Sequence, residues 1–179
     1  IVLSIIFIFQ FSACVSSIHN LSQGEAVFAS DHASFLISKD EKDNTSGTVS
    51  SEVYLCNGNN RIYVTSLPRG GEAAWAPDGS YFFINDYEGS DYSSCKIYYG
   101  KTGDLVLDCA QDIVEKAKKD NALFLFIKDW YHLYILGVSW EDTNNVVLHI
   151  SGSGGEESPA RSFDEKYSVR ISDKKYFKE

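Results

Sequence analysis

Short apolar or alternating runs separated by dense turn signals dominate this chain and predict an all-β fold. Residues 167–171 alternate apolar and polar side chains, which is typical of a strand with one buried face. Residues 81–85 and 123–127 are apolar on both faces, so we expect both to be central strands. Further strands are expected at residues 33–38, 53–56, 61–65, 73–76, 95–99, 105–107, 131–138 and 146–150.

A single segment, residues 110–119, shows helical spacing instead. Four apolar residues recur there at the i, i+3, i+4, i+7 spacing of one helix face: Ala110, Ile113, Val114 and Ala117. Asp108, with Gln111 three residues later, is expected to cap the start of this helix. Two polar stretches, residues 40–51 and 151–160, are expected to be loops.

The first eleven residues are uncharged and almost wholly apolar, and Ser12, Ala13 and Cys14 follow them. This order is typical of the hydrophobic core and cleavage site of a secretory signal peptide. The sequence has no methionine, so we expect this signal to be truncated at its start. The expected organisation is a signal peptide at 1–13, a tether at 14–23 and a single β-rich domain at 24–179.

Residues 11–14 also resemble the lipobox of bacterial lipoproteins, in which the cysteine is acylated. Phe11 departs from that pattern, because the family usually has leucine there. The resemblance implies a lipid anchor at Cys14 and a periplasmic or outer-membrane-anchored lipoprotein. The alternative is an ordinary signal peptide cut a few residues later, for instance after Ser17. Both alternatives predict an exported protein.

Export would place Cys56, Cys95 and Cys109 in an oxidising compartment, where disulfides persist. Residues 96–108 read as a hairpin that turns at residues 100–104, which puts Cys95 opposite Cys109. Directly opposed strand residues lie close to the distance that a disulfide needs. We expect either a Cys95–Cys109 disulfide or three free thiols.

Residues 74–83 read AWAPDGSYFF, and the polar loop, the strand KIYY and the turn KTG follow up to residue 103. In order and spacing this segment resembles the WD40-like β-propeller repeat of Tol-system and prolyl-peptidase propellers. Pro77 and Gly79 suit a tight turn, and Trp75 suits the space between stacked sheets. Degenerate copies are expected near residues 30–37 and 138–150.

The resemblance implies blade-like antiparallel sheets. Closed propellers have four to eight blades of about 42 residues each, which leaves the chain without its signal peptide short of a comfortable closed ring. We therefore expect a partial propeller, or a twisted meander or sandwich, with one short helix near 110–119.

Charge and motifs exclude several function classes. The net charge of −9 leaves no basic surplus for nucleic acid or for an anionic membrane surface, so membrane contact is expected only through Cys14. The four histidines lack metal-ligand spacing, and no nucleophile elbow or phosphate-binding glycine loop occurs. We expect no catalytic residue, no metal and no cofactor.

The densest polar group falls on a loop between two expected strands: Asp86, Tyr87, Glu88, Asp91 and Tyr92. These side chains could hold Ca²⁺ or face a partner, or they could form a solvated loop in which aspartates bond backbone N–H groups. A second group of aromatic residues is expected to form core rather than a sugar platform: Trp130, Tyr131, Tyr134 and Trp140.

These observations favour an exported, non-catalytic binding protein that uses its loops, such as residues 86–92, on a protein partner. One alternative is a hydrolase whose carboxylates, such as Asp86 and Asp91, act at that loop; it requires a concave pocket and a perturbed carboxyl pKa. Another alternative is a segment of a larger β-propeller.

Overall fold

The structure is a computed structural model that describes residues 17–21, 25–31, 33–42, 49–119, 121–127, 130–154 and 162–179. The expected signal peptide and Cys14 lie outside the described residues. The elements in chain order are β1 His19–Asn20, β2 Ala26–Phe28, β3 Ser34–Lys42, β4 Val49–Asn57, β5 Asn60–Leu67, β6 Gly71–Trp75, β7 Tyr81–Asp86, β8 Tyr92–Tyr99, β9 Leu105–Asp108, α1 Cys109–Lys118, the 3₁₀ helix η1 Ala122–Ile127, β10 Trp130–Trp140, β11 Asn145–Gly154, β12 Ser162–Arg170 and β13 Lys175–Lys178.

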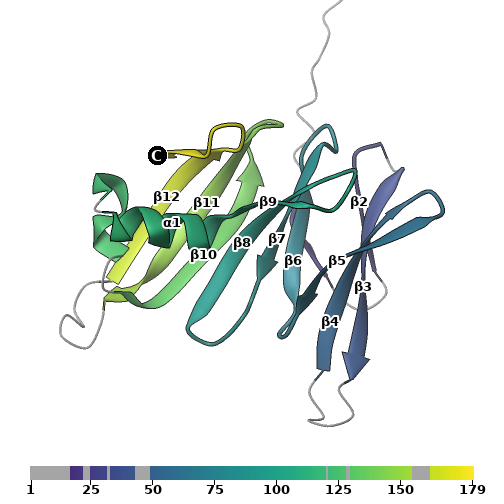
Figure 1. Cartoon of the computed structure of the whole chain (residues 1–179), viewed down its shortest axis with the longest axis horizontal. Helices are drawn as coiled ribbons and strands as arrows, with labels where there is room; N and C mark the ends of the chain where they lie inside the picture. The colour runs from purple at the N-terminus through teal and green to yellow at the C-terminus, as the bar shows by residue number, and fades with distance from the viewer. Residues whose placement is uncertain are drawn as a thin grey trace, which may run out of the picture.

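The strands form three four-stranded antiparallel meanders, β2–β5, β6–β9 and β10–β13, which follow one another from right to left in Figure 1. The first meander is a separate sheet. A short parallel pairing of β8 with β10 joins the other two, and β1 pairs with the free edge of β6. No pairing among the described strands closes a sheet into a barrel. The predicted all-β fold class is confirmed.

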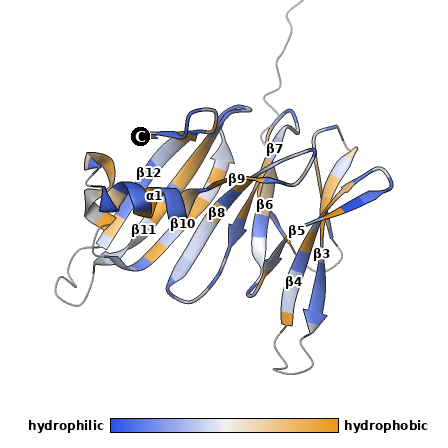
Figure 2. Cartoon of the chain, viewed as in Figure 1, coloured by the Kyte–Doolittle hydropathy of each residue, from blue (hydrophilic) through white to orange (hydrophobic). Residues whose placement is uncertain are grey.

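The middle meander is covered on both faces. One face packs against β2–β5 through a core that includes Phe82 and Ile84, and the other packs against β10–β13 through a core that includes Phe83 and Ile97. Hydrophobic residues recur along strands of all three meanders in Figure 2. This arrangement explains why residues 81–85 are apolar on both faces, as predicted for a central strand.

The corner after the first strand of each meander is built in the same way. Asp31, Asp78 and Asp142 each accept a hydrogen bond from the backbone N–H two residues later, at 2.9, 3.0 and 2.7 Å. Gly79 in the middle corner has φ of 73°, which a residue without a side chain adopts at little cost. The segments near residues 30 and 138 thus share this aspartate hydrogen bond with residues 75–80, although the corner at 141–144 is one residue shorter than the corner at 76–80. That they are repeats of one propeller motif stays a prediction.

Two indoles tie consecutive meanders together at these corners. Trp75 Nε1–H donates to the Val27 carbonyl at 2.8 Å, and Trp140 Nε1–H donates to the Ala74 carbonyl at 3.2 Å. Val27 and Ala74 occupy equivalent positions, each one residue before the aromatic residue of its own corner, Phe28 or Trp75. Each tryptophan thus bonds the same point of the preceding meander.

The prediction of a strand at residues 123–127 is wrong, because these residues form the 3₁₀ helix η1. Asn121 starts the turn: its side chain accepts from the Leu123 N–H and its carbonyl accepts from the Phe124 N–H. Phe124 and Ile127, three residues apart, are both fully buried, whereas Leu123 is exposed. A five-residue apolar run fits either pattern, and the spacing of its buried positions decides the outcome.

The predicted helix is confirmed as α1, whose first residue is Cys109. Asp108 caps it, since its side chain accepts the Gln111 N–H at 3.0 Å. Cys109, Ala110, Ile113 and Ala117 are buried. Figure 2 shows the side of α1 toward the viewer as mainly hydrophilic.

The two expected loops are shorter than predicted. Strand β3 reaches Lys42, β4 begins at Val49, and β11 runs to Gly154, while residues 43–48 and 155–160 lie outside the described residues. Part of the expected tether also belongs to the fold, because β1 pairs with β6 and Leu21 is buried.

The hairpin expected around residues 100–104 is present, with Ile97 opposite Leu107 as predicted and a bulge between Ile97 and Tyr98. Cys95 and Cys109 are buried, free thiols in this structure. Their side chains share a hydrogen bond, which together with burial raises the pKa of Cys109. The disulfide stays a prediction.

Candidate functional site

Residues 86–92 join β7 to β8 at the lower end of the middle meander as drawn in Figure 1. The Gly89 N–H donates to the Tyr92 carbonyl at 3.1 Å and closes the turn. Glu88 and Asp91 are exposed and Tyr87 and Tyr92 are half-buried. The loop therefore presents both carboxylates and phenol rings to solvent.

Asp86 lies beneath this loop, with only 2% of its surface exposed. Lys96 Nζ lies 2.8 Å from Asp86 Oδ2 and 2.7 Å from Glu88 Oε1. Burial raises the pKa of the Asp86 carboxyl above its ordinary value, although the hydrogen bond from Lys96 opposes this shift. Burial disfavours the charge on Lys96, but its hydrogen bonds to Asp86 and Glu88 outweigh burial and raise its pKa. The three groups form one anchored cluster.

The other oxygen of Asp86, Oδ1, is buried and has no hydrogen-bond partner among the described residues. A buried acceptor without a partner is unusual in a folded chain. It is also shut away from solvent, so Asp86 can position the loop but does not face a ligand from outside.

The parallel pairing of β8 with β10 brings the loop beside a segment about 40 residues later in the chain. Leu133 pairs with Tyr92, and the Leu133 N–H donates to the Asp91 carbonyl at 3.0 Å. Tyr134 Oη–H donates to the Ser90 carbonyl at 2.6 Å. These bonds fix the loop against the first residues of β10.

The start of β10 is rich in partly exposed rings. Tyr131 is 54% exposed, and the half-buried Trp130 lies 5.9 Å from Tyr92 between ring centroids. The rings of His132 and Tyr134 stack at 6.5 Å. Together with the loop they form a surface that we call the rim: Tyr87, Glu88, Asp91, Tyr92, Trp130, Tyr131, His132 and Tyr134.

The expectation that the β10 aromatic residues form core therefore needs a correction. Trp140 is buried, as expected, and it stacks on Phe83. Tyr131 is exposed, and Trp130 and Tyr134 are only half-buried. These three lie among the first five residues of β10, beside the exposed loop at 86–92, whereas Trp140 ends the strand within the core.

Burial raises the pKa of Tyr87 and of Tyr92 to about 12, with a hydrogen bond to Glu72 adding to the shift at Tyr87. Both phenols are therefore neutral at physiological pH. They offer apolar ring area and a hydroxyl next to exposed carboxylates, a combination that suits contact with another protein.

A buried polar clip holds β7 against β10 and so positions the rim. Asn85 Oδ1 accepts the Gly137 N–H at 2.7 Å, and Asn85 Nδ2 donates to the Gly137 carbonyl at 2.9 Å. A Cβ at Gly137 would lie 2.9 Å from Phe83 Cε2, so glycine permits this close approach. The sequence places Asn85 at the end of an apolar strand, which signals a bonded side chain, but its partner is 52 residues away.

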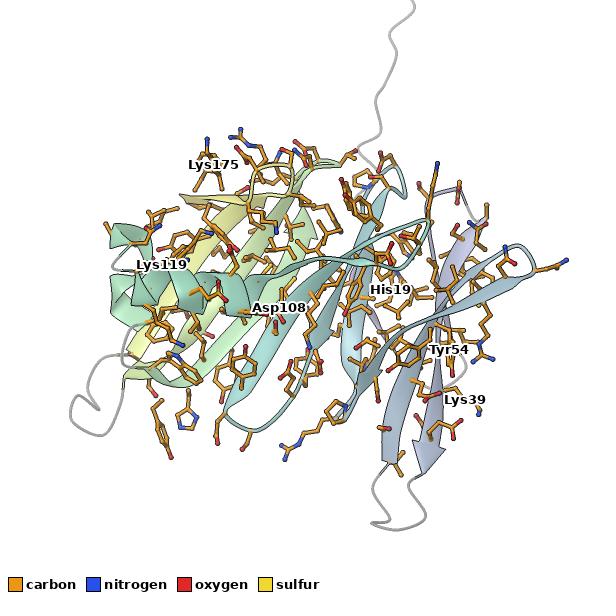
Figure 3. The ribbon with its side chains drawn as sticks, in the orientation of Figure 1. His19, Lys39, Tyr54, Asp108, Lys119 and Lys175 are labelled. Carbon is orange, nitrogen blue, oxygen red and sulfur yellow. The ribbon has the colours of Figure 1, made fainter. Side chains whose placement is uncertain are left out.

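Two hollows lie elsewhere on the described surface. One of about 230 Å³ lies between β9 and the first half of α1, and one of about 440 Å³ lies beside Tyr81 and Tyr99. Neither is lined by any of residues 86–92. Asp108, labelled in Figure 3 and lining the first hollow, accepts both the Ser94 hydroxyl at 2.8 Å and the Gln111 N–H.

Within the described residues, no three of the His, Cys, Asp and Glu side chains are placed to hold a metal ion. The same part of the chain contains no helix with the length and apolar character needed to cross a bilayer. Comparison with models of protein families, with curated proteins and with solved structures gives no match to this chain.

Proposed function

We propose that this chain is an exported interaction protein that binds a protein partner through the rim. The observation that carries the proposal is the β8–β10 pairing, which sets the exposed carboxylates of residues 86–92 beside the partly exposed rings of β10. Tyrosine and tryptophan are enriched at the energetic centres of protein interfaces. An acidic, aromatic surface of this kind fits a partner segment that carries basic side chains among apolar ones.

The net charge of −9 supports the same partner chemistry, because it attracts basic surfaces over several ångströms before contact. The apolar residues 1–11 and Cys14 support export, with acylation of Cys14 as the proposed anchor. The three equivalent corners support the resemblance to a WD40-like propeller repeat, and they fit equally a segment of a larger propeller.

The experiment immobilises two double variants of the full chain and captures binding proteins from an extract of the compartment to which the chain is exported. Tyr131→Ala with Asp91→Lys removes one ring and reverses one charge on the rim. The matched control, Phe177→Ala with Glu115→Lys, makes the same changes at exposed positions on β13 and α1. We expect the rim variant to lose a specifically retained protein that the control keeps. Equal retention by both variants would contradict the proposal.

A carboxylate-dependent hydrolase is the second candidate, favoured by the raised pKa and the unpartnered Oδ1 of Asp86. A catalytic carboxyl must be reachable by substrate, whereas the interaction proposal expects Asp86 to stay closed beneath Lys96. Modification of the folded chain with a water-soluble carbodiimide, read by peptide mass spectrometry, distinguishes them. Rapid labelling of Asp86 supports the hydrolase, and labelling only of exposed acids such as Glu88 and Asp91 supports the interaction protein.

A further inference from the structure

Each meander turns one particular face toward the meander before it in the chain. In β6–β9 this face carries Trp75, Phe82 and Ile84, and the core that it shares with β2–β5 buries all three. In β10–β13 the equivalent face carries Trp140 and Val146, which the core shared with β6–β9 buries in turn. In both β6–β9 and β10–β13, the preceding meander thus covers the aromatic corner residue and the apolar side of the second strand.

The same face of β2–β5 has no sheet over it among the described residues. Phe28 stands at the corner position of Trp75, and Phe35 and Ile37 stand at the positions of Phe82 and Ile84. Phe28 is 50% exposed. With two tyrosines of β4 and β5 these residues form a surface that we call the open face: Phe28, Phe35, Ile37, Tyr54 and Tyr63.

The open face is pre-organised by ring contacts between neighbouring strands. Phe28 and Phe35 lie 5.3 Å apart between centroids, and Tyr54 and Tyr63 meet edge to face at 5.8 Å. The Arg61 guanidinium lies 3.7 Å above the Tyr54 ring. Rings already held in place lose little freedom when another surface covers them.

Charge on this face is balanced although the chain as a whole is acidic. Lys39 and Arg61 contribute two positive charges, and Glu41 and Glu52 contribute two negative ones. Lys39 pairs with Glu41, and the Tyr54 hydroxyl bonds Glu52. This face therefore adds no net repulsion of its own between two copies of a chain whose net charge is −9.

We infer that the open face is a docking surface for a second copy of this chain, stacked face to face about a twofold axis. Strands β3 and β4 have nine residues each and β5 has eight. At about 3.3 Å per residue and about 4.8 Å between strands, the projected face is roughly 400–500 Å² per copy. Two copies would together bury about 800–1,000 Å², which is in the range of weak, concentration-dependent interfaces. This inference does not rest on the rim.

Sedimentation equilibrium of the full chain, from about 1 µM to about 500 µM, tests it. We expect a reversible dimer whose population rises within this concentration range. Phe28→Glu and Tyr63→Glu, each at a side chain at least half exposed, should weaken the dimer at least tenfold. The matched control is Phe177→Glu on β13, where the native ring is 47% exposed, and it should leave the dimer unchanged.

A wild-type chain that remains monomeric at about 500 µM would overturn the inference, as would a dimer that survives both open-face variants. Thermal unfolding at 1 µM checks that the variants fold, and either one suffices for the comparison. The rim variants of the binding experiment should dimerise normally. Loss of partner binding and loss of dimerisation therefore report on different surfaces.

Discussion

The meanders β2–β5 and β6–β9 contain the same corner but differ in what covers them. In the middle meander Trp75 is 4% exposed and Phe82 is fully buried, because a sheet lies on each face. In the first meander the equivalent Phe28 is half exposed and Phe35 is half-buried. Equivalent apolar positions can thus be core in one sheet and surface in the next, depending only on whether a neighbouring sheet is present.

This contrast also explains the division of roles along the chain. The middle meander is fixed from both sides by indole bonds and by the Asn85 clip, so it can hold the loop at 86–92 in one position. Among the described residues, the first meander packs against a sheet on one side, and its other side carries partly exposed apolar side chains. The rim is therefore held in place by the fixed middle meander, whereas the open face is the exposed side of the first meander.

The largest expected effect separates the two phenylalanines at equivalent positions. Phe82→Ala removes a fully buried ring between two sheets and should lower the free energy of unfolding by about 3–5 kcal/mol. Phe35→Ala on the open face should cost about 1 kcal/mol in dilute solution, because water already reaches that ring. Urea unfolding at 1 µM measures both, and equal losses would contradict the proposed difference in coverage.

The second-largest expected effect on stability comes from exchanging the aromatic residues of the first and second corners. Trp75→Phe reproduces the residue of the first corner, but it leaves the buried Val27 carbonyl without its donor and should cost about 1–3 kcal/mol. Phe28→Trp, the reverse change on the open face, should alter the free energy of unfolding by less than about 0.5 kcal/mol. A neutral Trp75→Phe would show that the indole bond does not fasten the sheets.

A methyl group at the junction of β7 and β10 tests the close approach there. Gly137→Ala would place a carbon 2.9 Å from Phe83 Cε2 and 3.0 Å from Cys95 Sγ, and overpacking of this kind costs about 1–3 kcal/mol. Gly89→Ala is the control, because its nearest neighbour, Asp91 N, would lie 3.9 Å away. Similar unfolding midpoints for the two variants would argue against a tight junction.

The smallest effect is the pH dependence of the cluster at Asp86. Burial raises the pKa of Asp86 above its ordinary value of 3.8 in the folded chain. The resulting stabilisation is fully present below the ordinary pKa and is lost as pH rises through the folded pKa. As pH rises from 3.5, the wild type should therefore lose unfolding free energy relative to the Asp86→Asn variant.

Asp173 provides a control of opposite sign, because the hydrogen bond from Arg170 lowers its pKa to about 2. Its stabilisation is present above pH 3.8 and is lost as pH falls toward 2, so Asp173→Asn should give the reverse slope. The free energy of unfolding, measured from pH 2 to pH 7, covers the pH ranges in which both carboxyls are expected to act. A flat difference for Asp86→Asn would show that burial does not perturb this carboxyl.

Local features of this fold could be predicted from sequence because neighbouring residues determine them. The Asp108 cap, the strand at 81–85 and the Pro-Asp-Gly corner each depend on a few adjacent side chains. The run at 123–127 was ambiguous because five apolar residues suit a strand or a helical turn, and only packing distinguishes them. The short, charged β13 gives almost no strand signal.

The candidate site could be predicted only in part for a different reason. The polar loop at 86–92 was visible in the sequence, but the rings that complete the rim lie about 40 residues later and join it through two parallel residue pairs. Whether a neighbouring sheet packs on a given sheet face also depends on residues far away in the sequence. No residue near Phe35 in the sequence indicates that, within the described part of the chain, its face is not covered by a sheet as that of Phe82 is.

Hydroxyl-radical footprinting at low and high protein concentration tests the contrast between the two meanders most directly. We expect oxidation of Phe28, Phe35 and Tyr63 to fall as protein concentration rises. Oxidation of Phe177 should stay constant, and that of Phe82 should stay low at every concentration. Oxidation of the open-face rings that does not change up to about 500 µM would contradict this expectation.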